Sequence, residues 1–161
     1  MFKVKNKSPD FIIAGFPKCG TSFLHSNLEK HDNIWMPNFE PVHFCTDLNY
    51  NSNYKNAEDY SKIFSKYRDL DGFITGEKTS NYICSNFAME AIHKNNKNTK
   101  IIITIRNPVD AIISYHNHNV RMGYEKIISI EDAILAQNKR KNSNYKIPYF
   151  AKKEKGRFFL L

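Results

Sequence analysis

The most informative stretch of the sequence is a glycine-containing loop with the residue types of an anion site. Gly15 and Gly20 frame four residues that include Lys18, and Thr21 and Ser22 follow directly. A glycine-rich turn ahead of a helix presents backbone N–H groups at the positive end of the helix dipole. Lys18 adds a positive charge, and the two hydroxyls add hydrogen-bond donors. The spacing therefore predicts an anion-binding loop between a strand and a helix.

This loop differs from the P-loop that binds ATP or GTP. The nucleotide signature G-x-x-x-x-G-K-[ST] places a lysine directly after its second glycine, where this sequence has Thr21. The chain also lacks a clear strand that ends in aspartate to hold magnesium, since its clearest strand ends in Arg106. A P-loop kinase that acts on a small molecule remains the alternative enzyme.

The loop resembles that of the PAPS-dependent sulfotransferases, P-K-[ST]-G-[ST]-[ST]. In that family the loop binds the 5′-phosphosulfate of 3′-phosphoadenosine 5′-phosphosulfate (PAPS). The resemblance implies donor binding by Pro17, Lys18, Cys19, Gly20, Thr21 and Ser22, with cysteine in place of the usual Ser or Thr.

A second match to the family lies in IRNPVDAIISYHNH. Arg106 and Ser114, eight residues apart, stand where the family has its 3′-phosphate site. The planar guanidinium of Arg106 suits a phosphate, and Ser114 lies about two turns along the following helix. The resemblance thus implies that these two residues select PAPS over ATP.

Two further segments resemble the carbohydrate-modifying, heparan-sulfate-type branch. FEPVHF is similar to K-E-P-H-F-F, which implies that Glu40 is the general base, although Phe39 replaces the lysine and Val42 is additional. GEKTSNYI is similar to E-K-[ST]-x-x-Y-[FIL], which implies an active-site role for Lys78. Lys18 would neutralise charge on the departing bisphosphate, and no metal is required. The implied acceptor is a hydroxyl or amine of a glycan.

The elements that would position these residues alternate between strands and helices. Apolar runs followed by glycine or arginine predict strands, and Pro108 and Ser129 mark helix starts. We expect an α/β fold of the P-loop type, with a central parallel sheet in three αβα layers. The expected strands are 11–15, 73–79 and 100–106, and GRFFLL begins another strand. Helices are expected after Gly20 and after Pro108, and over 57–67, 81–94 and 129–137. Residues 32–56 are expected to form a long loop.

Length and charge fit one basic domain. The chain has 161 residues and a net charge of +8, which favours anionic partners. We expect a single sulfotransferase-like domain over 1–161, with a polar extension at 1–9, a basic segment at 139–161 and a C-terminal part that is incomplete relative to the family. The cysteines Cys19, Cys45 and Cys84 form no CxxC pair, which argues against a disulfide framework or a zinc site.

Other readings of the basic composition remain open. A nucleic-acid-binding module is one, although the sequence has no binding fingerprint, and a sulfotransferase that binds PAPS without turnover is another. No segment has the length and hydropathy of a membrane span, and no signal peptide is recognised in MFKVKNKSPD, so the sequence predicts a cytoplasmic protein. Oligomeric state is not predicted.

Overall fold

The computed structural model describes residues 8–47, 54, 56–65 and 72–141, which divide into two units. The first unit, Met1–Ile105, contains a parallel sheet with its helices, and the second, Arg106–Leu161, contains two helices within its described residues. The strand expected at GRFFLL and most of the basic segment lie outside the described residues. Each unit is considered by itself, and the single-domain organisation stays a prediction.

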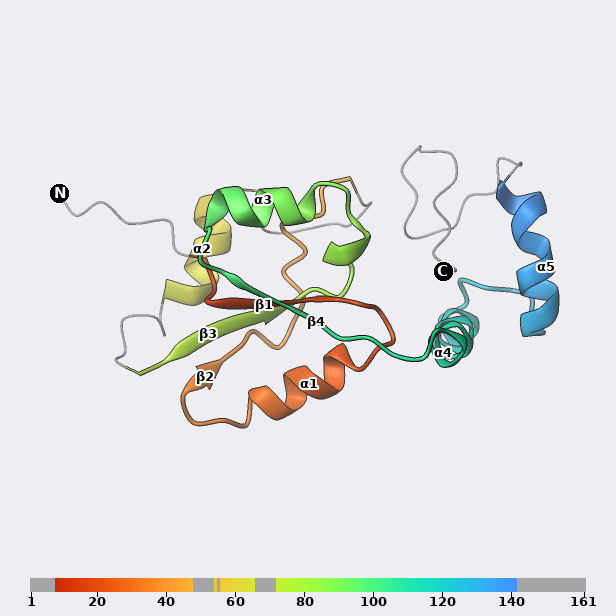
Figure 1. Cartoon of the computed structure of the whole chain (residues 1–161), viewed down its shortest axis with the longest axis horizontal. Coiled ribbons are helices and arrows are strands. Elements are labelled where there is room, and N and C mark those ends of the chain that lie inside the picture. Colours follow the sequence, from red (N-terminus) through yellow and green to blue (C-terminus); the bar gives the residue numbers. More distant parts are fainter. Residues whose placement is uncertain (1–7, 48–53, 55, 66–71, 142–161) are drawn as a thin grey trace. The chain divides into compact units, whose positions relative to one another are not determined.

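The sheet of the first unit has four parallel strands in the order β2–β3–β1–β4 among the described residues (Figure 1). Its members are β1 (Phe11–Gly15), β2 (Ile34–Trp35), β3 (Ile74–Lys78) and β4 (Lys100–Ile103). All five residues of β1 are buried, because this strand pairs with β3 on one side and β4 on the other. The three strands expected from the sequence are confirmed, and β4 is shorter than expected.

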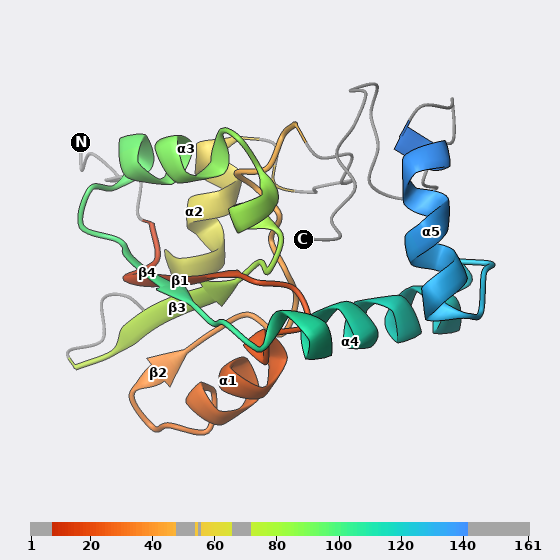
Figure 2. The ribbon, with the colours of Figure 1, turned by 45° about the vertical axis from the view of Figure 1, so that its right-hand side comes forward.

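Helices cover both faces of this sheet, which confirms the three-layer arrangement. Figures 1 and 2 show α1 (Thr21–Leu28) on one face and α2 (Ala57–Ser65) with α3 (Ala88–Asn95) on the other. Successive side chains of a strand point to opposite faces. Accordingly Phe11 and Ile13 pack with the side of α1, while Ile12 and Ala14 join the cluster that includes residues of α2 and α3.

Two expectations for the first unit were wrong in detail. The helix expected at 81–94 is a 3₁₀ turn, Tyr82–Cys84, followed by α3. The Ser85 hydroxyl explains the break, because it accepts hydrogen bonds from the amides of Phe87 and Ala88 and donates to Asp47 at 2.5 Å. Ser85 therefore ends the 3₁₀ turn in an extended conformation, and its hydroxyl binds the amides of Phe87 and Ala88 where α3 begins. The loop expected at 32–56 contains strand β2, whose two residues pair with β3.

The second unit contains α4 (Pro108–Arg121) and α5 (Ile130–Lys141), close to the expected helices. The Asn107 side chain accepts from the Val109 amide at 3.0 Å, and Ser129 accepts from the Asp132 amide at 3.1 Å, so both helices are capped. Glu125 and Arg140 form a two-contact ion pair at 2.6 and 2.8 Å that ties the α4–α5 connection to α5.

Candidate functional site

The loop between β1 and α1 is tightly constrained at its start. Gly15 has a φ of 151°, and a Cβ atom there would lie 2.9 Å from the Ser80 carbonyl oxygen and against the Ile83 side chain. The Phe16 amide donates to the Thr104 carbonyl at 2.9 Å, which fixes the loop to the end of β4. Glycine is therefore required at position 15 by the close approach of the chain that follows β3.

The other end of the loop is open and suited to an anion. Gly20, with a φ of 90°, precedes α1, and a Cβ atom there would meet nothing within 4 Å. No side chain caps α1, and no acidic residue occupies its first turn. The first N–H groups of a helix have no partners within the helix, and those of α1 have no side-chain cap. They form the partially positive end of the helix dipole, which favours a negatively charged group. Lys18 belongs to the same loop, with a left-handed φ of 64°.

Three residues taken from three separate motifs meet beside this loop. The Lys78 Nζ atom lies 2.8 Å from Glu40 Oε1 and 3.3 Å from the Ser22 hydroxyl. The side chains of Lys78 and Glu40 are 16% and 31% exposed, so the pair is sheltered without being sealed from solvent. A cation, a carboxylate and the uncapped start of α1 therefore share one region of the first unit. These groups could stabilise a negative charge and accept a proton within one site.

The surroundings of this ion pair include residues that the motifs did not indicate. The Ser80 hydroxyl donates to Glu40 Oε1 at 3.4 Å. Glu77, next to Lys78 in β3, is fully buried among hydroxyl groups. The sequence holds a signal for it, since Thr75, Glu77 and Thr79 alternate and all are buried polar residues of one strand face.

His43 is held by packing in the same loop as Glu40. Its ring stacks on Tyr60 at 4.6 Å, and its Nδ1 atom lies 2.5 Å from the Tyr54 carbonyl oxygen. A carbonyl only accepts hydrogen bonds, so Nδ1 carries the proton. Burial lowers the pKa of His43, against a smaller opposite effect of this hydrogen bond. This geometry favours a structural role over that of the general base.

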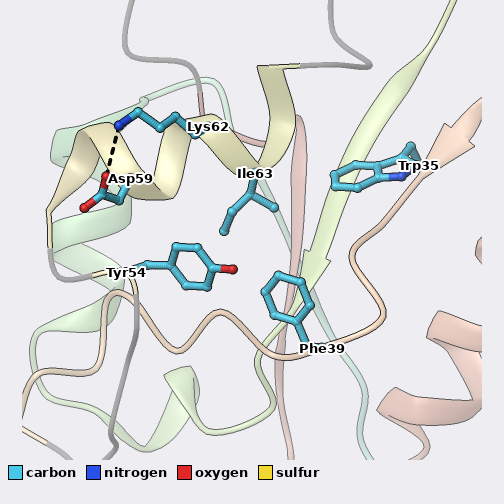
Figure 3. A pocket seen from close by; sticks show the side chains of 6 residues that line it. All are labelled: Trp35, Phe39, Tyr54, Asp59, Lys62 and Ile63. Carbon is cyan, nitrogen blue, oxygen red and sulfur yellow. Dashed lines mark hydrogen bonds and ion pairs between the residues drawn. The ribbon is translucent and has the colours of Figure 1, made fainter.

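A pocket of about 510 Å³ lies on the far side of Phe39, the residue before Glu40. Figure 3 shows its lining, in which the rings of Phe39 and Tyr54 stack at 5.7 Å with 10° between their planes. The remaining lining residues are Trp35, Asp59, Lys62 and Ile63. The pocket thus combines aromatic faces with one ion pair.

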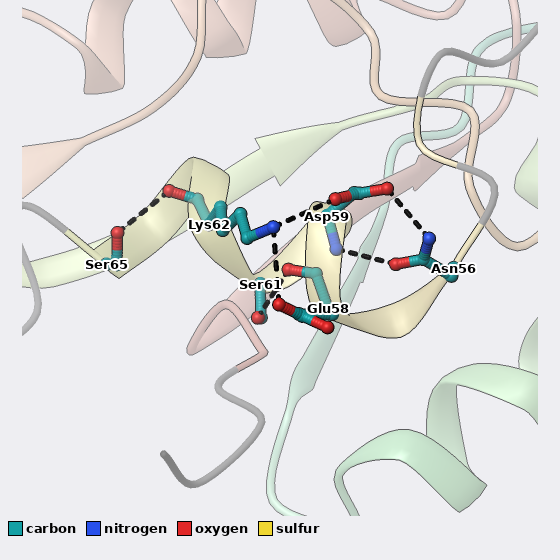
Figure 4. Close-up of polar contacts among 6 residues, drawn as sticks. All are labelled: Asn56, Glu58, Asp59, Ser61, Lys62 and Ser65. Carbon is teal, nitrogen blue, oxygen red and sulfur yellow. Dashed lines mark hydrogen bonds and ion pairs between the residues drawn. The ribbon is translucent and has the colours of Figure 1, made fainter.

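The charged part of this lining comes from the first turns of α2 (Figure 4). Asn56 caps the helix by accepting from the Asp59 amide at 2.8 Å, and it donates to the Asp59 carboxylate at 2.7 Å. Lys62 pairs with Asp59 at 3.1 Å and with Glu58 at 3.3 Å. Because two carboxylates face one ammonium group, this wall offers no excess positive charge to an anionic ligand.

Arg106 and Ser114 belong to the second unit. Arg106 stands directly before α4, 45% exposed, with Nε 3.9 Å from the Asp110 carboxylate. Ser114 is half-buried in the middle of α4. An exposed guanidinium with one distant carboxylate partner can still bind an anion, and the 3′-phosphate role of both residues stays a prediction.

The cysteines and the acidic residues show no other reactive centre in the described chain. Burial raises the pKa of the Cys45 thiol to about 12 and that of Cys84 to about 11, so neither supplies a thiolate at neutral pH. Over the same residues, no three His, Cys, Asp or Glu side chains are grouped as a metal site. No helix in these ranges has both the length and the apolar character needed to cross a membrane.

Comparisons with known proteins identify a family. The model of the family described as "Sulfotransferase domain" matches residues 8–158. The membrane-associated sulfotransferase kil1 of Dictyostelium discoideum is 28% identical over 159 residues, which covers 91% of this chain and 33% of that protein. Human heparan sulfate glucosamine 3-O-sulfotransferase 3B1 is 35% identical over 111 residues, 66% of this chain and 25% of that protein.

A solved structure agrees with these matches. The crystal structure of a sulfotransferase from Alicyclobacillus acidocaldarius superposes with a TM-score of 0.68 at 26% identity, covering 87% of this chain and 61% of that one. The chain spans about a quarter to a third of the length of the two curated relatives, kil1 and 3-O-sulfotransferase 3B1.

Proposed function

Because the chain belongs to the sulfotransferase domain family, we propose that it transfers the sulfuryl group of PAPS to a hydroxyl or amine of a carbohydrate. The observation that carries this proposal is the contact of Lys78 with both Glu40 and Ser22, at 2.8 and 3.3 Å. It joins a candidate base to the anion-binding helix end inside the first unit. The heparan sulfate 3-O-sulfotransferases among the relatives support a glycan acceptor.

The donor would bind at the loop of Pro17, Lys18, Cys19, Gly20, Thr21 and Ser22. The uncapped start of α1 and the open space over Gly20 fit a phosphosulfate group. The Cys19 amide donates to the Phe16 carbonyl at 3.2 Å, so it would have to exchange this contact to bind the donor, and the thiol itself is given no role. Arg106 and Ser114 would bind the 3′-phosphate, and this arrangement uses charge and hydrogen bonds with no requirement for a metal.

In the transfer step, the acceptor oxygen or nitrogen forms a bond to sulfur while the bond from sulfur to the bridging phosphate oxygen breaks. Glu40 takes the proton from the acceptor. Lys18 and the loop amides stabilise the negative charge that develops on the departing bisphosphate. Lys78, whose Nζ atom lies 2.8 Å from Glu40 Oε1, would interact with the transferring group next to the acceptor. Positioning and charge stabilisation dominate such in-line transfers.

The pocket lined by Phe39 and Tyr54 would bind part of the acceptor. The faces of Phe39 and Tyr54 suit the apolar face of a sugar ring, and the Asp59–Lys62 pair suits its hydroxyls. Because its lysine is already paired with two carboxylates, this wall favours a neutral or weakly charged portion of a glycan over a sulfate group.

A transfer assay with radiolabelled PAPS and a panel of glycan acceptors tests the function. Glu40→Gln removes the base while it keeps the side-chain shape, so we expect turnover to fall by about a hundredfold or more. The matched control is Glu29→Gln, which changes an exposed carboxylate of the same unit that pairs with His25 at 3.2 Å. Near-normal turnover of Glu40→Gln would move the base elsewhere.

The same assay decides whether the chain is a sulfotransferase that binds its donor without turnover. Binding of 3′,5′-bisphosphoadenosine without transfer to any acceptor would favour that alternative. The relatives include a protein named as membrane-associated, and the cytoplasmic location of this chain stays a prediction.

A further inference from the structure

A carboxyl group of β3 is buried completely, although nothing in the proposed transfer uses it. Glu77 has no exposed surface and follows the buried Thr75 on the same strand face. Lys78, one residue later, points the other way, toward Ser22. Burial of a carboxyl group without hydrogen-bonding partners costs free energy. The partners of Glu77 therefore indicate its role.

Three hydroxyl groups surround this carboxyl. The Tyr60 hydroxyl donates to Glu77 Oε1 at 2.6 Å, and the Thr79 hydroxyl donates to Oε2 at 3.2 Å. The Tyr82 hydroxyl belongs to the same cluster and lowers the pKa of the carboxyl group. Tyr60, Tyr82 and Thr79 are themselves at most 1% exposed. Both carboxyl oxygens therefore accept a hydrogen bond, and the orientations of the Tyr60 and Thr79 hydroxyls are fixed by the direction in which they donate.

Two of these three hydroxyls also hold the loop that carries Glu40. The Thr79 hydroxyl accepts from the amide of Val42 at 3.3 Å, and the Tyr82 hydroxyl accepts from the amide of His43 at 3.0 Å. Val42 has a φ of 49°, a left-handed conformation that is unfavourable for a β-branched residue. Such a conformation is unfavourable and persists only where surrounding contacts enforce it. These two amide contacts supply that enforcement.

We propose that Glu77 is a positioning residue: it orients the Thr79 hydroxyl, which holds the Val42 amide beside the Tyr82 hydroxyl that holds the His43 amide, and it thereby places Glu40. The proposal rests on the proposed function, because it assigns a purpose to the placement of the base. A hydroxyl that donates to Glu77 presents its lone pairs to the loop amides. Without an acceptor at position 77, the hydroxyl hydrogen can turn toward other acceptors, and the loop loses its fixed anchors.

Tyr60 provides a matched control within the same cluster. It donates to the same carboxylate as Thr79, and its ring packs against His43. Within the described part of the chain, its hydroxyl hydrogen-bonds to Glu77 and not to the backbone of residues 40–43. Tyr60→Phe and Tyr82→Phe each remove one buried hydroxyl and keep the ring, but only Tyr82→Phe removes an anchor of the loop.

Hydrogen exchange of the Val42 and His43 amides, resolved by NMR in the 161-residue chain, tests the anchoring directly. Loss of a hydrogen bond worth about 1.4 kcal/mol speeds exchange about tenfold. We expect that increase at His43 in Tyr82→Phe, and at Val42 in both Thr79→Val and Glu77→Met, because methionine has no carboxyl oxygen to accept from the Thr79 hydroxyl. An unchanged Val42 rate in Glu77→Met would overturn the proposal. In Tyr60→Phe both amides should stay within about threefold of the parent, by the same conversion. Equal changes in the two tyrosine variants would overturn the proposal.

Turnover supplies a second readout that a merely structural role would not move. We expect Tyr82→Phe and Thr79→Val to lower kcat about tenfold relative to Tyr60→Phe, for the same lost contact. The affinity for 3′,5′-bisphosphoadenosine should be unchanged, because the loop at 17–22 is untouched. If the tyrosine variants lose kcat equally, the positioning role is refuted. If the parent transfers nothing, the proposed function fails, and if Glu40→Gln remains active, the assignment of the base fails. In both cases the exchange rates still decide the anchoring.

Discussion

The buried Glu77 carboxyl gives a prediction for stability as a function of pH. Burial raises its pKa from the ordinary 4.5 to about 7, against hydrogen bonds from Tyr60, Tyr82 and Thr79 that lower it, while the charge of Glu40 adds to the rise. The folded protein therefore holds this proton more tightly than the unfolded chain does. Stability contributed by the protonated form is present below pH 4.5 and is lost as the pH rises to about 7.

The size of the effect follows from the two pKa values. One unit of difference corresponds to about 1.4 kcal/mol, so the interval from 4.5 to about 7 corresponds to about 3 kcal/mol. Between pH 5 and pH 8, most of this amount, on the order of 2 to 3 kcal/mol, should disappear from the free energy of unfolding. Glu77→Gln keeps the side-chain shape without the titration, so its stability should lack this loss.

Urea unfolding at several pH values measures the difference between the two proteins. Trp35 is the single tryptophan and packs edge-on against Phe64 of α2 at 5.9 Å, so its fluorescence reports on the unit that contains Glu77. The comparison with Glu77→Gln cancels other titrations, such as that of His43, whose lowered pKa acts with the opposite sign. Curves that stay parallel from pH 5 to pH 8 would refute the reasoning.

Three further substitutions test other parts of the account. Arg106→Glu should weaken binding of 3′,5′-bisphosphoadenosine at least tenfold by calorimetry, because a charge-assisted contact is lost. Arg121→Glu, at the other end of α4, should leave the affinity unchanged. Equal affinities of the two variants would contradict the assignment of the 3′-phosphate site. Phe39→Ala should raise the acceptor KM about tenfold with little change in donor affinity, if stacking contributes about 1.4 kcal/mol, and an unchanged KM would exclude the pocket from acceptor binding. Gly15→Ala should lower the melting temperature strongly, since the added methyl group meets Ile83 and the Ser80 carbonyl; a parent-like melting temperature would contradict the packing described.

Much of the first unit could be predicted from the sequence because its signals are local. The run FIIAG is apolar on both faces and becomes the central strand β1, buried throughout. Asn107 and Ser129 cap their helices as their positions indicate. The break at Ser85 could not be seen in this way, because it depends on Asp47, a residue 38 positions away in the chain.

The candidate site also contains residues that could be predicted from the sequence and one that could not. The motifs indicated Glu40, Lys78 and Ser22 separately, and the structure brings these three together. The motifs did not indicate Glu77, whose partners come from α2, β3 and the following turn and meet only in the folded chain. Its one sequence signal is a charged residue between two threonines of a strand, which a pattern of apolar residues does not detect.

The central claim is that the loop before α1 serves PAPS and not ATP. Calorimetric titration of the 161-residue chain with 3′,5′-bisphosphoadenosine, and separately with Mg-ATP, tests it most directly. We expect the bisphosphate to bind without added metal, this binding to be lost in Lys18→Ala, and Mg-ATP to bind much more weakly. Tight binding of Mg-ATP with no response to the bisphosphate would contradict it.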